Sequence, residues 1–82
     1  MFYVYILYSQ HADRYYVGQT DNLMERLESH LSGISRYTSI AEDWKLVHWE
    51  EFGTRESAIR RENEIKRKKS RKYIEWLCQN RD

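Results

Sequence analysis

The chain has 82 residues, of which 40% are hydrophobic and 33% charged, with three glycines and no proline. This composition excludes a disordered or fibrous protein, and the length predicts a single domain over residues 1–82. The longest apolar run, residues 2–8, is far too short to cross a bilayer, and no secretory signal precedes it, so we expect a cytoplasmic protein without a membrane partner. One cysteine and three scattered histidines exclude an internal disulfide and a structural zinc site.

The net charge of +1 is divided unevenly along the chain. Residues 1–54 hold four Lys/Arg against eight Asp/Glu, a net −4, whereas residues 55–82 hold ten against five, a net +5. A basic block of this kind either solvates a helix or forms the electrostatic footprint of a polyanion-binding protein. The charge pattern alone leaves both interpretations open.

The first residues have the composition of a β-hairpin. Residues 2–8 are aromatic, β-branched or leucine and are followed by a polar turn at residues 9–14. Residues 15–19 supply a second strand, and the short connection makes the pair antiparallel. Gly18 in this strand marks a position where backbone or ligand approaches closely.

A helix is expected after the hairpin. Good capping residues at 20–22 precede three leucines that recur every fourth residue: Leu23, Leu27 and Leu31. Gly33 provides the stop, and the polar residues 32–43 suggest a loop that lines a site.

The second half of the chain predicts one strand and two helices. Residues 44–52 return to a strand-like composition. Thr54 can cap a helix at about 55–69, and Ser70 can cap another at about 71–79. The order ββαβαα therefore predicts an α/β (α+β) fold, in which a three-stranded antiparallel sheet is flanked by three helices.

Glu62 is out of place on the helix expected at 55–69. Ala58, Ile59 and Ile65 are the apolar positions of this helix, and at about 100° per residue Glu62 points within roughly 15° of their centre. Burying an unpaired charge is costly. Glu62 therefore pairs with a basic residue, most simply an arginine, binds a cation, or lies where the stripe opens into a cleft.

Other polar side chains can meet on one face of the sheet. Arg26 and His30 are four residues apart and share a flank of the leucine stripe. Tyr3 and Tyr5 alternate along the first strand, and Tyr16 lies on the adjacent strand, so their hydroxyls can cluster. An ordinary surface pair and ordinary packing tyrosines are the competing interpretations.

The order of these residues resembles the signature of the GIY-YIG nuclease superfamily. Tyr3-Val4-Tyr5 is similar to its first triplet and Tyr16-Val17-Gly18 to its second, followed by Arg26 on a helix and Glu62 on a later helix. The chain is most similar to short stand-alone bacterial members, which look like the N-terminal nuclease domain of the excision-repair endonuclease. It departs from the pattern at Tyr3, where the family has glycine, and lacks a clear counterpart of the asparagine that many members carry after the glutamate helix.

The resemblance implies a metal-dependent DNA endonuclease that hydrolyses phosphodiester bonds and is linked to DNA repair or recombination. Glu62 is expected to hold one divalent cation, Mg²⁺ or alternatively Mn²⁺. Arg26 is expected to contact the scissile phosphate. Either Tyr5 or His30 is the general base, and Tyr16 helps to orient these groups.

The resemblance also implies DNA as the partner, in branched, damaged or single-stranded form. The residues expected to bind it are Arg36, Tyr37 and Thr38 in the loop and Lys66, Arg67, Lys68, Lys69, Arg71 and Lys72 in the basic run. The alternative is a nucleic-acid-binding module of the same fold with little or no nuclease activity.

Overall fold

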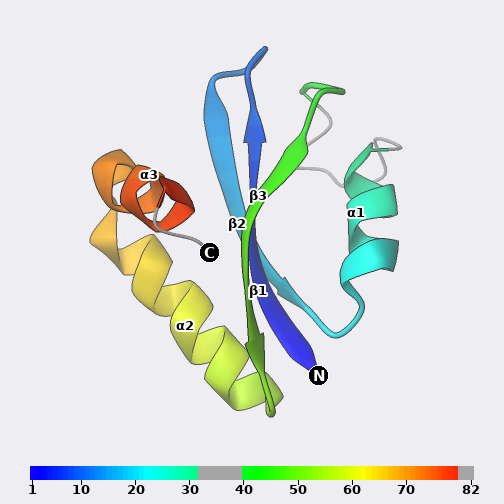
Figure 1. Cartoon of the computed structure of the whole chain (residues 1–82), viewed down its shortest axis with the longest axis vertical. Coiled ribbons are helices and arrows are strands. Elements are labelled where there is room, and N and C mark those ends of the chain that lie inside the picture. The colour runs from blue at the N-terminus through cyan, green and yellow to red at the C-terminus, as the bar shows by residue number, and fades with distance from the viewer. Residues whose placement is uncertain (32–39, 80–82) are drawn as a thin grey trace.

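A computed structural model of the chain describes residues 1–31 and 40–79 and confirms the expected order ββαβαα (Figure 1). The elements are β1 (Phe2–Ser9), β2 (Arg14–Thr20), α1 (Leu23–Leu31), β3 (Lys45–Phe52), α2 (Arg55–Lys68) and α3 (Arg71–Gln79). The third strand starts just after Trp44, and Lys69 is the C-cap of α2, with a left-handed φ of 48°. Both boundaries lie one residue inside the expected ranges.

The three strands form one antiparallel sheet in the order β2-β1-β3, so β1 is central and β2 is an edge strand. Tyr5 on β1 is paired with Gly18 on one side and Trp49 on the other. Figure 1 shows α1 on one face of the sheet and α2 with α3 on the other. Because side chains alternate along a strand, neighbouring residues of β1 point to opposite faces of the sheet, one toward α1 and the next toward α2 and α3.

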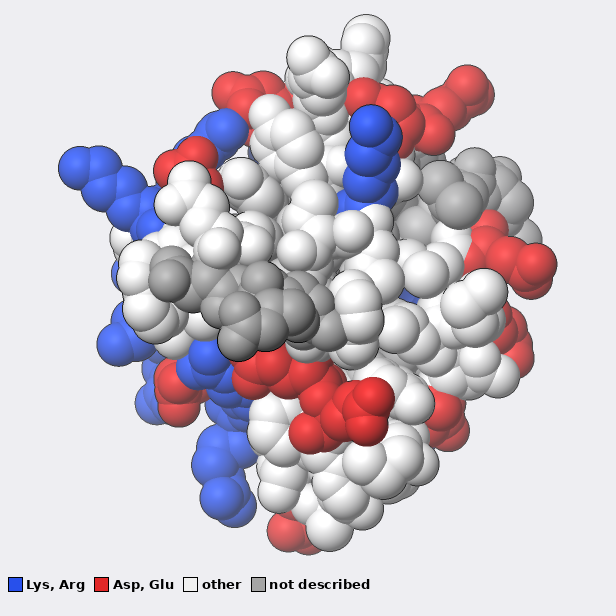
Figure 2. Space-filling model, in the orientation of Figure 1, with Lys and Arg blue, Asp and Glu red and all other residues white. Residues whose placement is uncertain are grey.

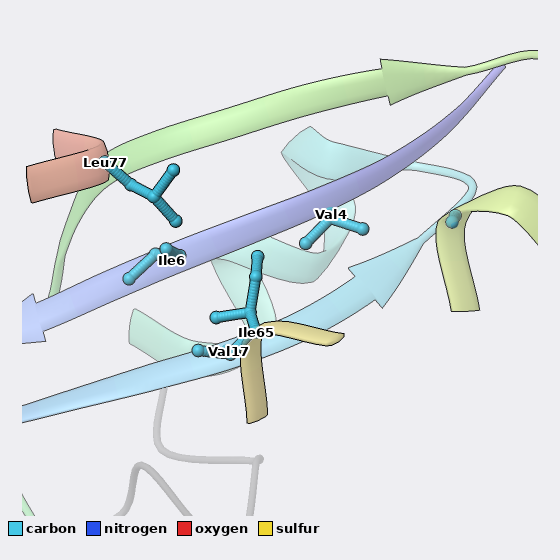
Figure 3. Packing of buried hydrophobic residues seen from close by; sticks show 6 residues of the cluster. Val4, Ile6, Val17, Ile65 and Leu77 are labelled. Carbon is cyan, nitrogen blue, oxygen red and sulfur yellow. The ribbon is translucent and has the colours of Figure 1, made fainter. Parts of the chain in front are cut away.

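The α2 and α3 face holds an apolar core. Figure 3 shows side chains from β1, β2, α2 and α3 meeting there, and its buried members are Val4, Ile6, Val17, Ala58, Ile65 and Leu77. Ile59 is not among them, because 38% of this residue is exposed, so the expectation that it belongs to the buried stripe is wrong. Without Ile59 the stripe is centred between Ala58 and Ile65, and Glu62 lies at its flank, roughly 50° from the centre.

Side-chain caps fix where each helix begins. The Asn22 Oδ1 accepts a hydrogen bond from the backbone N–H of Glu25 at 3.1 Å, and the hydroxyls of Thr54 and Ser70 cap α2 and α3 in the same way. The Asn22 cap lies two residues after the end of β2, and α1 covers the face of the sheet opposite α2 and α3 (Figure 1). None of the helices in residues 1–31 and 40–79 is long and apolar enough to span a membrane.

Candidate active site

A buried tyrosine hydroxyl is the centre of the polar cluster between β1 and α1. Tyr5 is 1% exposed, and its hydroxyl lies 2.8 Å from the Nε2 of His30 and accepts a hydrogen bond from the Nε of Arg26 at 3.2 Å. Arg26 and His30 reach the same atom because residues four apart share one face of a helix. His30 is itself 1% exposed, so the pair is not ordinary surface chemistry.

Tyr16 and Gly18 on the neighbouring strand complete this arrangement. The ring of Tyr16 has its centroid 4.8 Å from that of His30 and 6.1 Å from that of Tyr5. A Cβ on Gly18 would lie 2.6 Å from the Tyr5 hydroxyl oxygen, so any other residue would displace that hydroxyl. The close approach expected at Gly18 is therefore made by the Tyr5 side chain. We call Tyr5, Tyr16, Arg26 and His30 the α1-face cluster.

Burial determines the protonation states in the α1-face cluster. Burial raises the pKa of Tyr5 to about 12, although the hydrogen bond from Arg26 opposes this rise. Burial, helped by the positive charge of Arg26, lowers the pKa of His30 to about 4. Among the described residues, no carboxylate forms an ion pair with Arg26. At neutral pH the cluster therefore combines a neutral phenol, a neutral imidazole and one uncompensated guanidinium.

Glu62 lies on the other face of the sheet, on α2. Arg61 and Glu62 flank the buried stripe on opposite sides, and Arg61 turns toward β3, where its Nε donates to the Oε1 of Glu50 at 2.9 Å. Given the strand order, Glu62 leans toward the β2 edge. Its carboxylate accepts a hydrogen bond from the Nζ of Lys66 at 2.8 Å and its side chain is 17% exposed. The partner is thus a lysine, and the simplest expectation of an arginine was wrong.

Two contacts between α2 and the β2 region show which part of β2 Glu62 lies beside. At the start of α2, Arg55 pairs with Asp21, just beyond the end of β2, at 3.3 Å. Further along α2, Lys66 lines a hollow together with Tyr16. Since Glu62 precedes Lys66 by about one helical turn, it lies beside the stretch of β2 between these two contacts. Glu62 and the α1-face cluster therefore lie on opposite faces of the sheet, near the same edge strand.

Gln19 was missed by the sequence reasoning. It alternates with Gly18 and so faces the same side of the sheet as Val17, toward α2. Its Oε1 is buried and has no hydrogen-bond partner among residues 1–31 and 40–79. The only sequence signal is an amide on an edge strand at a position that faces α2. Gln19 thus offers an unused oxygen on the face and at the stretch of β2 where Glu62 lies.

These oxygens fit only a sparsely coordinated cation. No group of three or more His, Cys, Asp or Glu side chains suited to a metal occurs in residues 1–31 and 40–79. Mg²⁺, however, is commonly held by one or two carboxylates, with water and substrate phosphate completing its shell. Glu62, with the Gln19 oxygen on the same face, fits that mode provided that Lys66 releases the carboxylate.

The nucleic-acid-binding residues expected from the sequence fall into two groups. Arg36, Tyr37 and Thr38 lie outside the described residues. The six basic residues of the run are at the end of α2 and the start of α3, and Figure 2 shows most of the visible Lys and Arg side chains on the side formed by these helices. Within this group, Arg71 is held by Asp13 through a 2.6 Å ion pair.

Comparison with known proteins shows the family. The model of the GIY-YIG catalytic domain matches residues 1–74. The chain belongs to the GIY-YIG family. GIY-YIG proteins form a superfamily of nucleases, whose members generally use divalent metal ions and bind DNA substrates.

Several proteins similar to this GIY-YIG chain carry the name UPF0213. Two of them, from Streptococcus pneumoniae serotype 4 (strain TIGR4) and strain R6, are each 35% identical over 81 residues, which is 98% of this chain and 81% of theirs. The solution NMR structure of a UPF0213 protein from Bacillus halodurans has a TM-score of 0.60 and 34% identity, covering 96% of this chain and 84% of that one. These names specify no activity.

Proposed function

We propose that this GIY-YIG domain is a metal-dependent DNA endonuclease that hydrolyses phosphodiester bonds. The observation that carries the proposal is the uncompensated charge of Arg26 beside the buried Tyr5 and His30 pair. A guanidinium without a carboxylate can receive an anion, and its planar fork suits the oxygens of a phosphate. Membership of a nuclease family supports the scissile phosphate as that anion.

Tyr5 and His30 divide the handling of the proton. A phenol with a pKa of about 12 is ionised in only about one molecule in 10⁵ at pH 7, so Tyr5 is not the final proton acceptor. It can instead pass a proton on: the attacking water gives a proton to the Tyr5 oxygen while the Tyr5 hydroxyl gives its own to the Nε2 of His30. The 2.8 Å contact between these two atoms supports this route.

The bound phosphate favours His30 in this role. A negative charge beside the cluster raises the pKa of both groups. For His30, that change moves the pKa from about 4 toward the unperturbed value of about 6.5 and makes the imidazole a stronger base. For Tyr5, the same change makes the phenolate still rarer. We therefore assign His30 as the general base, Tyr5 as the proton relay between the attacking water and His30, Tyr16 as a positioning group, and Arg26 as the phosphate ligand.

Glu62 is the proposed holder of the divalent cation, with the Gln19 oxygen as a second protein ligand. When bound, Mg²⁺ or Mn²⁺ would neutralise charge on phosphate oxygens that reach the α2 side of the edge strand β2. Lys66 holds the carboxylate in the absence of the cation and keeps the buried part of Glu62 paired.

The pairing of Lys66 with Glu62 also favours a second candidate function, a nucleic-acid-binding module without turnover. A lysine on the carboxylate opposes cation binding by charge repulsion, so the domain could bind phosphate through Arg26 without hydrolysing it. The two functions differ in their requirement for metal.

The test uses labelled branched, single-stranded and duplex DNA incubated with the purified protein in Mg²⁺, Mn²⁺ or EDTA. Metal-dependent cleavage that Arg26→Ala and Glu62→Gln both strongly reduce supports the endonuclease. The matched controls are Arg60→Gln and Glu56→Gln, which change exposed residues of α2. Binding without turnover in every metal would select the module instead. Undiminished cleavage by Arg26→Ala or Glu62→Gln would overturn the site assignment.

A further inference from the structure

A hollow separates the edge strand β2 from the corner between α2 and α3. Its volume is about 620 Å³, within the roughly 300–1,000 Å³ of small-molecule sites. Its apolar lining comes from Val17, Ile65 and Ile74, and four basic residues stand around them: Arg14, Lys66, Lys69 and Arg71. Figure 2 shows Lys and Arg side chains gathered on the side of the molecule formed by α2 and α3.

The basic residues of this hollow are not all engaged within the protein. Lys66 and Arg71 pair with Glu62 and Asp13. Arg14 and Lys69, in contrast, form no ion pair in the part of the chain that the structure describes. Two uncompensated cations beside an apolar lining suit a ligand that is anionic at one end and flat and apolar at the other. A nucleotide has both properties.

We propose that this hollow binds one unpaired nucleotide of a DNA strand that continues from the scissile phosphate. The hollow adjoins the proposed cation holder, because Lys66 lines it and also holds Glu62. Tyr16, whose ring lies beside His30 on the α1 face, borders the hollow at the edge strand β2, so a strand could reach from one face to the other around this edge. The base contacts the apolar lining, and the adjacent phosphates lie against Lys69 and Arg14. A base must leave its duplex to make such a contact, so the preferred substrate has a single-stranded segment beside the cleavage position.

This inference rests on the proposed function for its orientation, but its test does not require cleavage. The protein, with ¹³C-labelled isoleucine and valine methyl groups, is titrated in EDTA with thymidine oligomers of about four nucleotides, near the lower end of known site sizes. Parallel titrations use an abasic oligomer of the same length, a blunt duplex, and thymidine monophosphate. The methyl group of Ile59, which lies on α2 outside the hollow, is the internal reference.

The expected result is that the thymidine oligomer shifts the methyl signals of Ile74, Ile65 and Val17, whereas the abasic oligomer and the duplex leave them in place. Equal shifts with the abasic oligomer would show that phosphate alone is bound and would overturn the base site. If the monophosphate binds as tightly as the oligomer, the hollow is a site for free nucleotides, and the proposal that it binds a nucleotide within a DNA strand is overturned.

A pair of variants tests the cationic rim separately. Lys69→Asn keeps a residue that tolerates the left-handed backbone, and Lys72→Gln is the matched control, because Lys72 belongs to the same basic run but does not line the hollow. Lys69→Asn should weaken oligomer binding and reduce the slope of log affinity against log salt by about 1, whereas Lys72→Gln should have the smaller effect on both. Equal effects would reduce the role of Lys69 to general attraction and contradict the site. Because binding is measured in EDTA, a failure here is distinguishable from a failure to cleave.

Discussion

The two faces of the sheet each carry a polar group of arginine, histidine and tyrosine side chains, but only one of these groups contains a carboxylate. On the α2 and α3 face, Glu50 accepts hydrogen bonds from the Nε of Arg61 at 2.9 Å and lies 2.8 Å from His48, while Arg61 also donates to the Tyr73 hydroxyl at 3.0 Å. We call His48, Glu50, Arg61 and Tyr73 the Glu50 network. The α1-face cluster has the same three residue types. Among the described residues, however, no acidic side chain forms an ion pair with its arginine, Arg26.

A polar group that stabilises the fold and one that is free to bind a ligand differ in whether the charge of the arginine is neutralised within the protein. Burial raises the pKa of Glu50, but its hydrogen bonds with Arg61 and His48 outweigh burial and hold the pKa below its usual range. The guanidinium of Arg61 is thereby neutralised within the protein. Among the described residues, the side-chain partners of Arg26 are the hydroxyls of Tyr5 and Tyr16 and no carboxylate, so its charge remains for a ligand. The same residue types therefore stabilise the fold on one face and are proposed to bind substrate on the other.

The largest effect is expected on stability from Arg61→Met. Removing one partner of a buried ion pair typically costs about 3–5 kcal/mol, because the other charge is left uncompensated. Arg61 and Glu50 have side-chain exposures of 18% and 25%, so we expect the lower part of that range. Chemical denaturation of the purified variant measures the loss. The double variant Arg61→Met with Glu50→Gln should recover part of it, and a purely additive loss would contradict the pairing.

Arg26→Ala, in contrast to Arg61→Met, should reduce cleavage strongly and stability only slightly. We expect cleavage to fall by about 10²–10³-fold, the range for removing one donor that stabilises transition-state charge. Stability should change by less than in Arg61→Met, because no carboxylate loses its partner. Initial rates and unfolding midpoints of the two variants make the comparison. A large loss of stability in Arg26→Ala with unchanged rates would reverse the assignment of the two faces.

The third prediction concerns the pH dependence of stability. The pKa of His30 is about 4 in the folded protein, against about 6.5 in an unfolded chain, so between these values the unfolded state binds the extra proton. The free energy of unfolding should therefore fall as the pH falls from about 6.5 to about 4, by about 3 kcal/mol in total from this group. His30→Gln, whose amide oxygen can still accept from Tyr5, should remove this part of the slope. An unchanged slope would show that His30 is not buried in its neutral form.

Gly18→Ala should have a smaller effect on stability and a specific effect on the α1-face cluster. The added Cβ would lie 2.6 Å from the Tyr5 hydroxyl, and overpacking of this kind typically costs about 1–3 kcal/mol. Since the displaced hydroxyl leaves its hydrogen bonds with Arg26 and His30, cleavage should fall as well. The same change at Gly53, whose Cβ would meet nothing within 4 Å, is the control. Equal effects of the two substitutions would show that the spacing around Tyr5 is not critical.

Local patterns in the sequence were sufficient for the fold and for part of the candidate site. The caps at Thr54 and Ser70 were predicted correctly because capping depends on neighbouring residues. The meeting of Arg26 and His30 was also expected, because helical spacing places them on one face. Such features need no knowledge of distant contacts.

Features that depend on which distant elements meet could not be predicted in this way. Periodicity placed Ile59 in the buried stripe, but the stripe is only as wide as the contact of α2 with the sheet, and Ile59 lies beyond it. The pairing of Arg61 with Glu50 could not be predicted either, because Glu50 is on a separate strand, 11 residues away, unlike Glu64, the local partner of Arg61 on the same helix. The pKa values of Tyr5 and His30 depend on burial between β1 and α1, which no local pattern contains.

The smallest effect on stability is expected from Lys66→Met. This variant tests whether Glu62 is held less firmly by its basic partner than Glu50 is. Glu50 is held by two nitrogens of Arg61, whereas Glu62 is held by one lysine four residues away whose own side chain is 53% exposed. The loss of stability should therefore be nearer to the value for exposed helical pairs, about 0.3–0.5 kcal/mol, than to the cost expected at Arg61. The loss of this positive charge should strengthen Mn²⁺ binding at Glu62, which paramagnetic broadening of nearby amide signals measures without any substrate. Lys68→Met, an exposed lysine not paired with Glu62, is the control. If Lys66→Met binds Mn²⁺ no better than the control does, the lysine is not the group that a cation displaces, and Glu62 is held for stability in the way that Glu50 is.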